Sequence, residues 1–154
     1  MIYFYKVLLD ETDTDLIEKG IRSHSIEKYY NLDILKSTVL VESKDRFFWG
    51  LEKKKSMKLL RIRSVIEFFL PKLIIKFDKN DFTKYSLRFS TLSLIIVIAM
   101  LIGFITAIFD TISNTPNFEP IVTSFIFIIS FYFLTRFEMR IINKKVNRAI
   151  QNKK

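Results

Sequence analysis

The sequence predicts an α+β fold, in which a small cytoplasmic domain precedes a C-terminal transmembrane helical hairpin. Short stretches of alternating or β-branched residues fill the first 88 positions, and two long apolar runs without charge follow them. We expect a strand–helix–antiparallel β-meander domain over 1–88 and a hairpin over 89–137, with helices at 89–110 and 118–137. A basic cytoplasmic tail helix should follow over 138–154.

The domain begins with a predicted strand and a predicted helix. Residues 2–9 are rich in aromatic and branched side chains, which is typical of a strand. The acidic segment 10–15 offers Thr and Asp side chains that can cap a helix. It does not fit an EF-hand calcium loop, because the Gly and Glu that such a loop requires are missing. Leu16, Ile17 and Ile21 recur at helical spacing, so we expect one short amphipathic helix that reaches Tyr29.

The rest of the domain is typical of an antiparallel β meander. The expected strands are 38–41, 46–51, 57–63, 73–77 and 85–89, with turns at 53–56 and 78–81. Leu60 and Ile62 alternate with Arg61 and Arg63, which predicts that the two pairs face opposite sides of a strand. Pro71 interrupts the pattern because proline cannot donate to a central ladder.

The two apolar runs are long enough to predict a hairpin through a bilayer. The first, 89–109, has 21 residues, which at about 1.5 Å each cover roughly 31 Å, enough for a hydrocarbon core of about 30 Å. The second, 120–135, has 16 residues and lengthens if Arg136 snorkels toward the headgroups. The alternative is a buried hairpin in a soluble core, but a chain of 154 residues offers little protein to surround it.

Basic residues flank the outer ends of the two apolar runs, and the loop that joins the runs has none. Segment 111–118 between the runs contains no Lys or Arg, whereas five basic residues lie shortly before the first run and five after the second. The positive-inside rule then places both termini in the cytoplasm. Abundant Ile, Phe, Lys and Asn are typical of an AT-rich bacterial genome, so the expected location is a bacterial inner membrane. The flanking residues are Lys72, Lys76, Lys79, Lys84 and Arg88, then Arg136, Arg140, Lys144, Lys145 and Arg148.

The helical pattern continues beyond Thr135, with apolar residues interleaved by the basic ones. This extension either lies along the headgroups, packs on the soluble domain or forms a solvated basic tail. The formal charge of +9 is concentrated on the segments next to the hairpin. Since positive-inside topology already accounts for that placement, we expect membrane lipids rather than nucleic acid as the partner of this charge.

The composition predicts no catalytic residues, no metal site and no cofactor. The chain has no cysteine and one histidine, His24, which excludes thiol chemistry, cysteine-ligated metals and most catalytic triads. His24 lies between Ser23 and Ser25, but a Ser–His pair also needs an orienting acid and an oxyanion site. We therefore interpret it as an ordinary boundary histidine.

Two groups of residues are candidate contact sites. Lys53, Lys54, Lys55 and Lys58 form the sharpest basic run, which either binds anionic lipid headgroups or is a solvated turn. The neighbouring aromatic residues 47–49 are interpreted as core. A second group, Ala99, Gly103 and Ala107, recurs every fourth residue, which predicts a helix-packing stripe. The stripe either closes the hairpin on itself, which we favour, or joins two protomers.

Several short motifs share one order along the chain. Residues 46–50 combine aromatic side chains with Gly50, residues 60–63 alternate Leu or Ile with Arg, and residues 69–71 read Phe-Leu-Pro. A two-helix hairpin, Phe137, Glu138 and a Lys-rich tail follow. Over about 46–150 the chain resembles a group of small uncharacterised bacterial two-helix membrane proteins with an N-terminal cytoplasmic β-rich domain. It departs from them at residues 75–77, where a glycine is expected. The resemblance implies architecture and no activity.

These features predict a non-enzymatic integral membrane protein that binds or scaffolds. Its basic, membrane-proximal domain would face a protein partner or anionic lipid, and the hairpin would contact a partner or a second copy of the chain. One alternative is an immunity or defence accessory protein that acts against a membrane-targeting toxin. Another is a small subunit of an oligomeric pore or transporter, although the hairpin has essentially no polar residue at mid-depth.

Overall fold

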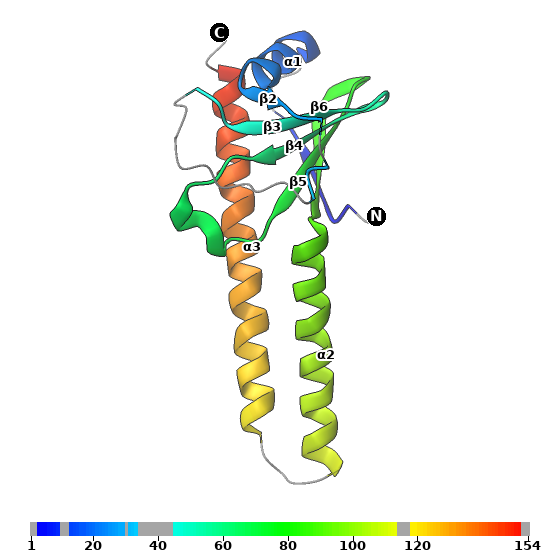
Figure 1. The fold of residues 1–154 in the computed structure, drawn as a ribbon, viewed down its shortest axis with the longest axis vertical. Helices are drawn as coiled ribbons and strands as arrows, with labels where there is room; N and C mark the ends of the chain where they lie inside the picture. Colours follow the sequence, from blue (N-terminus) through cyan, green and yellow to red (C-terminus); the bar gives the residue numbers. More distant parts are fainter. Residues whose placement is uncertain (1–2, 10–12, 30, 34–44, 114–117, 152–154) are drawn as a thin grey trace.

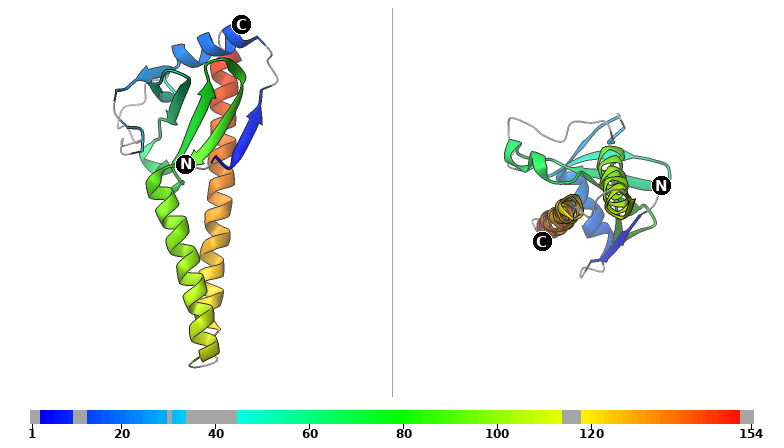
Figure 2. Two further views of the ribbon diagram at one scale, coloured as in Figure 1. Left: turned by 90° about the vertical axis from the view of Figure 1, so that its right-hand side faces the viewer. Right: turned by 90° about the horizontal axis from the view of Figure 1, so that it is seen from below.

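The computed structural model describes residues 3–9, 13–29, 31–33, 45–113 and 118–151, and within these it shows an α+β fold (Figure 1). A six-stranded mixed sheet packs on one face against helices α1 (Thr14–Ser23) and α3 (Glu119–Gln151). Helix α2 (Thr91–Ser113) leaves the end of the sheet and runs beside the first half of α3 (Figure 2). The predicted fold class is confirmed.

The sheet contains the predicted meander together with one strand that the sequence did not indicate. Its strand order is β1-β6-β5-β4-β3-β2, and all neighbours are antiparallel except β2 and β3. A short 3-10 helix, η1 (Val65–Phe69), precedes Pro71. The predicted strand at 38–41 lies outside the described residues. The strands are β1 (Tyr5–Leu8), β2 (Ser25–Glu27), β3 (Phe48–Glu52), β4 (Ser56–Arg61), β5 (Leu73–Asp78) and β6 (Asp81–Phe89).

Helix α1 begins as predicted but ends earlier. Asp13 caps it, because Oδ1 of Asp13 accepts hydrogen bonds from the backbone N–H groups of Asp15 (3.0 Å) and Leu16 (3.2 Å). The prediction that the helix reaches Tyr29 is wrong. Two serine hydroxyls, Ser23 Oγ and Ser25 Oγ, donate to carbonyl oxygens of the last turn, and such local bonds favour a helix end over continuation. The chain then turns into β2.

Helix α3 uses one stripe of side chains along its whole length. The residues on this stripe recur every three or four positions, and together they are less exposed than their neighbours. The first half of the stripe faces α2, and the second half packs on the sheet and α1. The residues after Thr135 therefore pack on the domain, which was one of the three alternatives. The stripe consists of Ile121, Ser124, Ile128, Phe131, Thr135, Glu138, Ile142, Val146 and Ala149.

The small-residue stripe does not close the hairpin as expected. Ala107 is buried between α2 and α3, but Ala99 and Gly103 are exposed, and no atom lies within 4 Å of the position a Cβ on Gly103 would occupy. Four residues advance a helix by about 400°, so a four-residue stripe drifts about 40° at each step. Within the hairpin, Ala107 therefore lies in the helix contact and Ala99 and Gly103 do not, and a contact of the stripe between two protomers stays a prediction.

Helices α2 and α3 are both long and apolar enough to cross a membrane. Only 11% of the most apolar window of α2 and 6% of that of α3 are buried. A core helix of a soluble protein would be mostly buried, so the alternative of a hairpin buried in a soluble core does not fit these helices. Helix α3 also crosses the predicted boundary at residues 137–138 without interruption.

Gly20 should tolerate no side chain at the contact between α1 and α3. A Cβ there would lie 2.7 Å from Ala149 O and 3.1 Å from Ile150 Cα, and both are backbone atoms. We expect Gly20→Ala to cost about 1–3 kcal/mol through overpacking, less about 1 kcal/mol gained in helix propensity. Thermal unfolding in detergent measures this. The matched control is Gly103→Ala, which meets no atom and should not lower the melting temperature. Equal melting of both variants would contradict the prediction.

Candidate functional site

Two arginines from the sheet meet one glutamate from α3 in the protein interior. Arg61 donates a bidentate pair of hydrogen bonds to Glu138, with Nε 3.1 Å from Oε1 and Nη2 2.6 Å from Oε2. Arg63 Nη2 lies 3.0 Å from the same Oε1, and this guanidinium also donates to Leu70 O (2.7 Å) and Pro71 O (2.5 Å). Arg61 and Glu138 are fully buried and Arg63 is 4% exposed, so all three charges are removed from water.

A fourth charged residue completes this group. Arg61 follows Leu59 on the face of β4 that packs against the helices, which directs its guanidinium toward α3. Glu67 in η1 accepts at one oxygen, Oε2, from Ser64 N (3.0 Å) and from Arg61 Nη1 (2.7 Å). We call Arg61, Arg63, Glu67 and Glu138 the charge cluster. Its two positive and two negative groups balance.

Burial and pairing act in opposite directions on the charge cluster. Burial disfavours the charged form of Arg61, but the hydrogen bonds and charges of Glu138 and Glu67 outweigh it and raise the pKa of Arg61. For Arg63 burial dominates and repulsion from Arg61 adds to it, so its pKa is lowered despite Glu138. Burial also opposes ionisation of Glu67, yet the bonds from Ser64 N and Arg61 hold its pKa below the usual range. The arginines remain protonated at any physiological pH.

A second buried ion pair holds the beginning of α2. Arg88 in β6 forks onto Asp33, with Nη2 2.7 Å from Oδ2 and Nη1 3.1 Å from Oδ1. Thr91 N donates to the same Oδ1 at 3.1 Å, so this carboxylate lies at the helix N-terminus, where negative charge is favourable. Lys72 adds two bonds, from its N to Ser93 Oγ (2.9 Å) and from its Nζ to Asp33 O (2.8 Å). Both hairpin helices are therefore attached to the domain through buried polar contacts.

The second face of the sheet carries a row of lysines. Lys58 in β4 pairs directly with Lys76 in β5, Lys76 with Ser86 in β6, and Ser86 with Lys6 in β1. Directly paired residues share a face, so the three lysines project to the same side. We call this surface the open face, because no helix within the described ranges packs on it, although Leu32 and Asp33 cover its end next to α2. Figure 2 shows α1 and α3 together on the opposite side of the sheet.

The open face carries paired and unpaired cations within the described part of the chain: Arg88 pairs with Asp33 and Lys84 with Asp81, whereas the three lysines of the row have no carboxylate partner. Lys6, Lys58 and Lys76 form no ion pair there. Burial, followed by repulsion from Lys53, Arg88 and Lys76, lowers the pKa of Lys58, although Asp33 opposes the shift. Like charges opposite one another in a sheet are destabilising. An anion on this face would relieve that repulsion.

The predicted basic turn lies elsewhere. Residues 53–55 connect β3 and β4, beside the β5–β6 turn, where Lys79 N donates to Lys55 O at 3.2 Å. Because β6 runs from that turn into α2, these turns lie at the end of the sheet away from the hairpin (Figure 1). This placement gives no support to a headgroup contact by Lys53, Lys54 and Lys55, which stays a prediction. Lys58 belongs to the open face instead.

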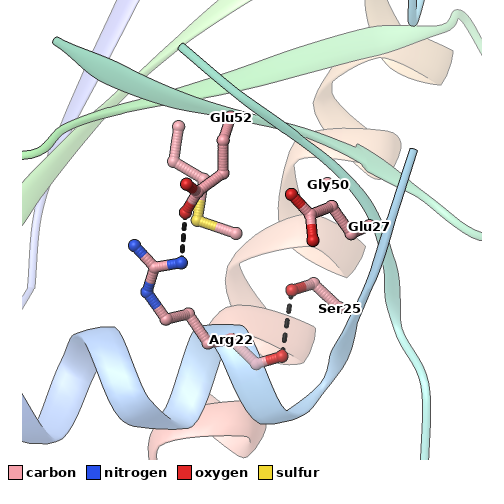
Figure 3. A pocket seen from close by; sticks show the side chains of 6 residues that line it. Arg22, Ser25, Glu27, Gly50 and Glu52 are labelled. Atoms are coloured by element: carbon pink, nitrogen blue, oxygen red, sulfur yellow. Dashed lines mark hydrogen bonds and ion pairs between the residues drawn. The ribbon is translucent and has the colours of Figure 1, made fainter. Parts of the chain in front are cut away.

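A small polar pocket lies between α1, β2 and β3 (Figure 3). Its volume is about 210 Å³, and its lining includes Arg22, Glu27 and Glu52. Arg22 pairs with Glu52 across the pocket and with Glu18 at 2.7 Å, and Lys79 Nζ lies 3.2 Å from Glu52. These charges largely satisfy one another, so the pocket is a weaker candidate site than the open face.

His24 and the aromatic run occupy structural positions. His24 Nδ1 lies 2.9 Å from Gly20 O at the end of α1, and its ring stacks on Phe47 with centroids 4.9 Å apart. Phe47 and Phe48 are buried, and Trp49 packs against the small apolar cluster on the open face. His24 is therefore buried rather than at the boundary that we expected, and the interpretation of the aromatic run as core holds for Phe47 and Phe48, while Trp49 is partly buried. No group of three or more His, Asp or Glu residues suits a metal ion in the described ranges.

The structure defines an α+β protein with a basic open sheet face and two helices long and apolar enough to cross a membrane. No family model, no curated protein and no solved structure matches the chain.

Removing the Glu138 carboxylate from the charge cluster should destabilise the protein strongly. Glu138→Gln leaves Arg61 and Arg63 buried beside a neutral side chain. Removing one partner of a buried ion pair lowers the free energy of unfolding by about 3–5 kcal/mol. The free energy of unfolding in detergent measures the loss. Lys144→Gln, an exposed change of charge on the same helix, is the control and should remain within about 0.5 kcal/mol. An unaltered Glu138→Gln protein would show that the cluster contributes no net stability.

Lys72 should make stability depend on alkaline pH. Burial, with repulsion from Arg63 and Arg88, lowers its pKa from 10.5 to about 8, although Asp33 opposes the shift. Between these values the unfolded chain binds a proton that the folded chain does not, so folding is favoured as pH rises from 8 to 10.5. The melting temperature of the native chain should therefore rise relative to that of Lys72→Gln between pH 7 and pH 9.5. Parallel pH profiles would refute this.

Proposed function

We propose that the chain is a non-enzymatic membrane protein of the bacterial inner membrane whose cytoplasmic open face binds an acidic segment of a protein partner. The observation that carries the proposal is the row of Lys6, Lys58 and Lys76 across neighbouring strands, without a neutralising carboxylate in the described part of the chain.

The membrane location is supported by the exposure of the two helices. Helices α2 and α3 pack side by side and antiparallel, and their outward faces carry large apolar side chains. Water would leave this surface unfavourably exposed, whereas lipid would not. The domain that joins both helices at one end is basic, and the positive-inside rule assigns basic flanks to the cytoplasm.

The direction of the open face favours a protein over the bilayer as its partner. Only Ser90 separates β6 from α2, so the strand points toward the membrane and the sheet stands upright on it (Figure 1). An upright face meets the cytoplasm along most of its length and lipid headgroups only at its lower end. Positive charge without internal partners complements acidic side chains, and it also steers their encounter.

A defined acidic probe tests this proposal. The full chain is placed in nanodiscs of phosphatidylcholine, and binding of a labelled polyglutamate peptide is measured. Each exposed charge contact contributes about 0.2–1 kcal/mol, so Lys6→Gln/Lys58→Gln/Lys76→Gln should weaken binding about tenfold. The control Lys53→Gln/Lys54→Gln/Lys55→Gln removes the same charge at the far turn and should weaken it less.

Three outcomes would overturn or redirect the assignment. Equal weakening by both triple variants would mean that peptide binding follows net charge and not the open face. No binding by the native chain would refute the proposal outright. If added phosphatidylglycerol in the nanodisc displaced the peptide from the native chain but not from the open-face variant, the face would be a lipid surface instead.

A further inference from the structure

An apolar groove lies at the junction between the sheet and the hairpin. Its volume is about 350 Å³, within the range of about 300–1,000 Å³ typical of small-molecule sites. It is bounded by the beginning of β1, the end of β6, and one side each of α2 and α3. The side chains that matter below are Phe4, Phe89, Val97, Phe131, Tyr132 and Arg136.

Aromatic rings form one wall of this groove. Phe4 stacks on Phe89 with centroids 4.6 Å apart, and Phe89 lies 6.0 Å from Phe131. Phe89 is the last residue of β6, and α2 begins two residues later. The groove therefore lies at the level where the apolar helices enter the domain, and Tyr132, a side chain typical of membrane interfaces, is 56% exposed beside it.

Two cations lie next to this apolar surface. Arg136 lines the groove, and Arg140 lies one helical turn further toward the domain. Both side chains are exposed, and neither forms an ion pair in the described part of the chain. Like charges four residues apart on a helix repel each other. An anionic group between them would remove the repulsion.

From this combination we propose that the groove binds one anionic phospholipid of the inner leaflet. One acyl chain lies along the aromatic wall and Val97, and the phosphate is held by Arg136 and Arg140. The inference rests on the membrane location proposed above, and not on the open face. An apolar chain joined to an anion matches an apolar groove that has Arg136 in its lining and Arg140 one helical turn beyond it.

Native mass spectrometry of the full chain in mild detergent tests the site. We expect one phosphatidylglycerol to remain bound where phosphatidylcholine is lost, and phosphatidylglycerol should raise the melting temperature. Arg136→Gln/Arg140→Gln should reduce its retention about tenfold, whereas Lys144→Gln/Arg148→Gln, with the same loss of charge on the same helix, should not. Val97→Trp should fill the groove and abolish retention, and Ile102→Trp on the exposed side of α2 should not.

The outcomes separate this inference from the proposed function. Equal retention of both lipids, or unchanged retention in Val97→Trp, would overturn the lipid site while leaving the membrane assignment intact. If Arg136→Gln/Arg140→Gln and Lys144→Gln/Arg148→Gln lost lipid retention equally, retention would depend on the general charge of the helix and not on this site. That result would also overturn the lipid site. A chain that stays dispersed and folded without any detergent would overturn the membrane assignment itself.

Discussion

The contact between Glu138 and the two arginines of the sheet fixes how the two halves of this protein are joined. Glu138 lies on the continuous stripe of α3, at the place where the stripe stops facing α2 and starts facing the sheet. An unpaired carboxylate at this position would be costly, because it is fully buried. Only one register of α3 brings Glu138 to Arg61 and Arg63, so sliding the helix by one turn would leave Glu138 and Arg63 unpaired and Arg61 with Glu67 alone. The pair therefore specifies position, whatever its net contribution to stability.

The second anchor applies the same constraint to α2. Asp33 joins Arg88 of the sheet to the backbone N–H of Thr91, the first residue of that helix, and Ser90 is the only residue between strand and helix. With both helices attached at one end, the domain has little freedom to tilt relative to the hairpin. The upright direction of the open face then follows from these contacts, and a displacement of α3 within a bilayer would also move the core of the domain.

The sequence predicts the local features of this fold and misses those that depend on distant partners. The apolar helix pair, the helix cap within residues 10–15 and the meander strands that fall within the described residues arise from local patterns, and these are found. Strand β2 was missed because a three-residue parallel strand is stabilised by β3, more than twenty residues away. The alternation of Leu60 with Arg61 was read correctly, yet the burial of Arg61 was not foreseen, since its partner lies 77 residues further on. A signal was present, because Glu138 falls at the apolar spacing of α3, where an isolated charge requires a partner.

Basic charge in this chain lies in three different environments, which net charge alone conceals. Arg61, Arg63 and Arg88 are buried in ion pairs and are unavailable to any ligand. Arg136 and Arg140 remain exposed beside an apolar groove, where a positive charge suits a phosphate that carries a hydrocarbon chain. Beside the lysines of the open face, Leu60 and Ile74 are fully buried with Leu32, so charge is the feature this surface offers and the same physical argument favours an acidic occupant there. Whether a cation is buried and paired, next to an apolar groove or on the open face therefore bears on its partner more than its place in the sequence does.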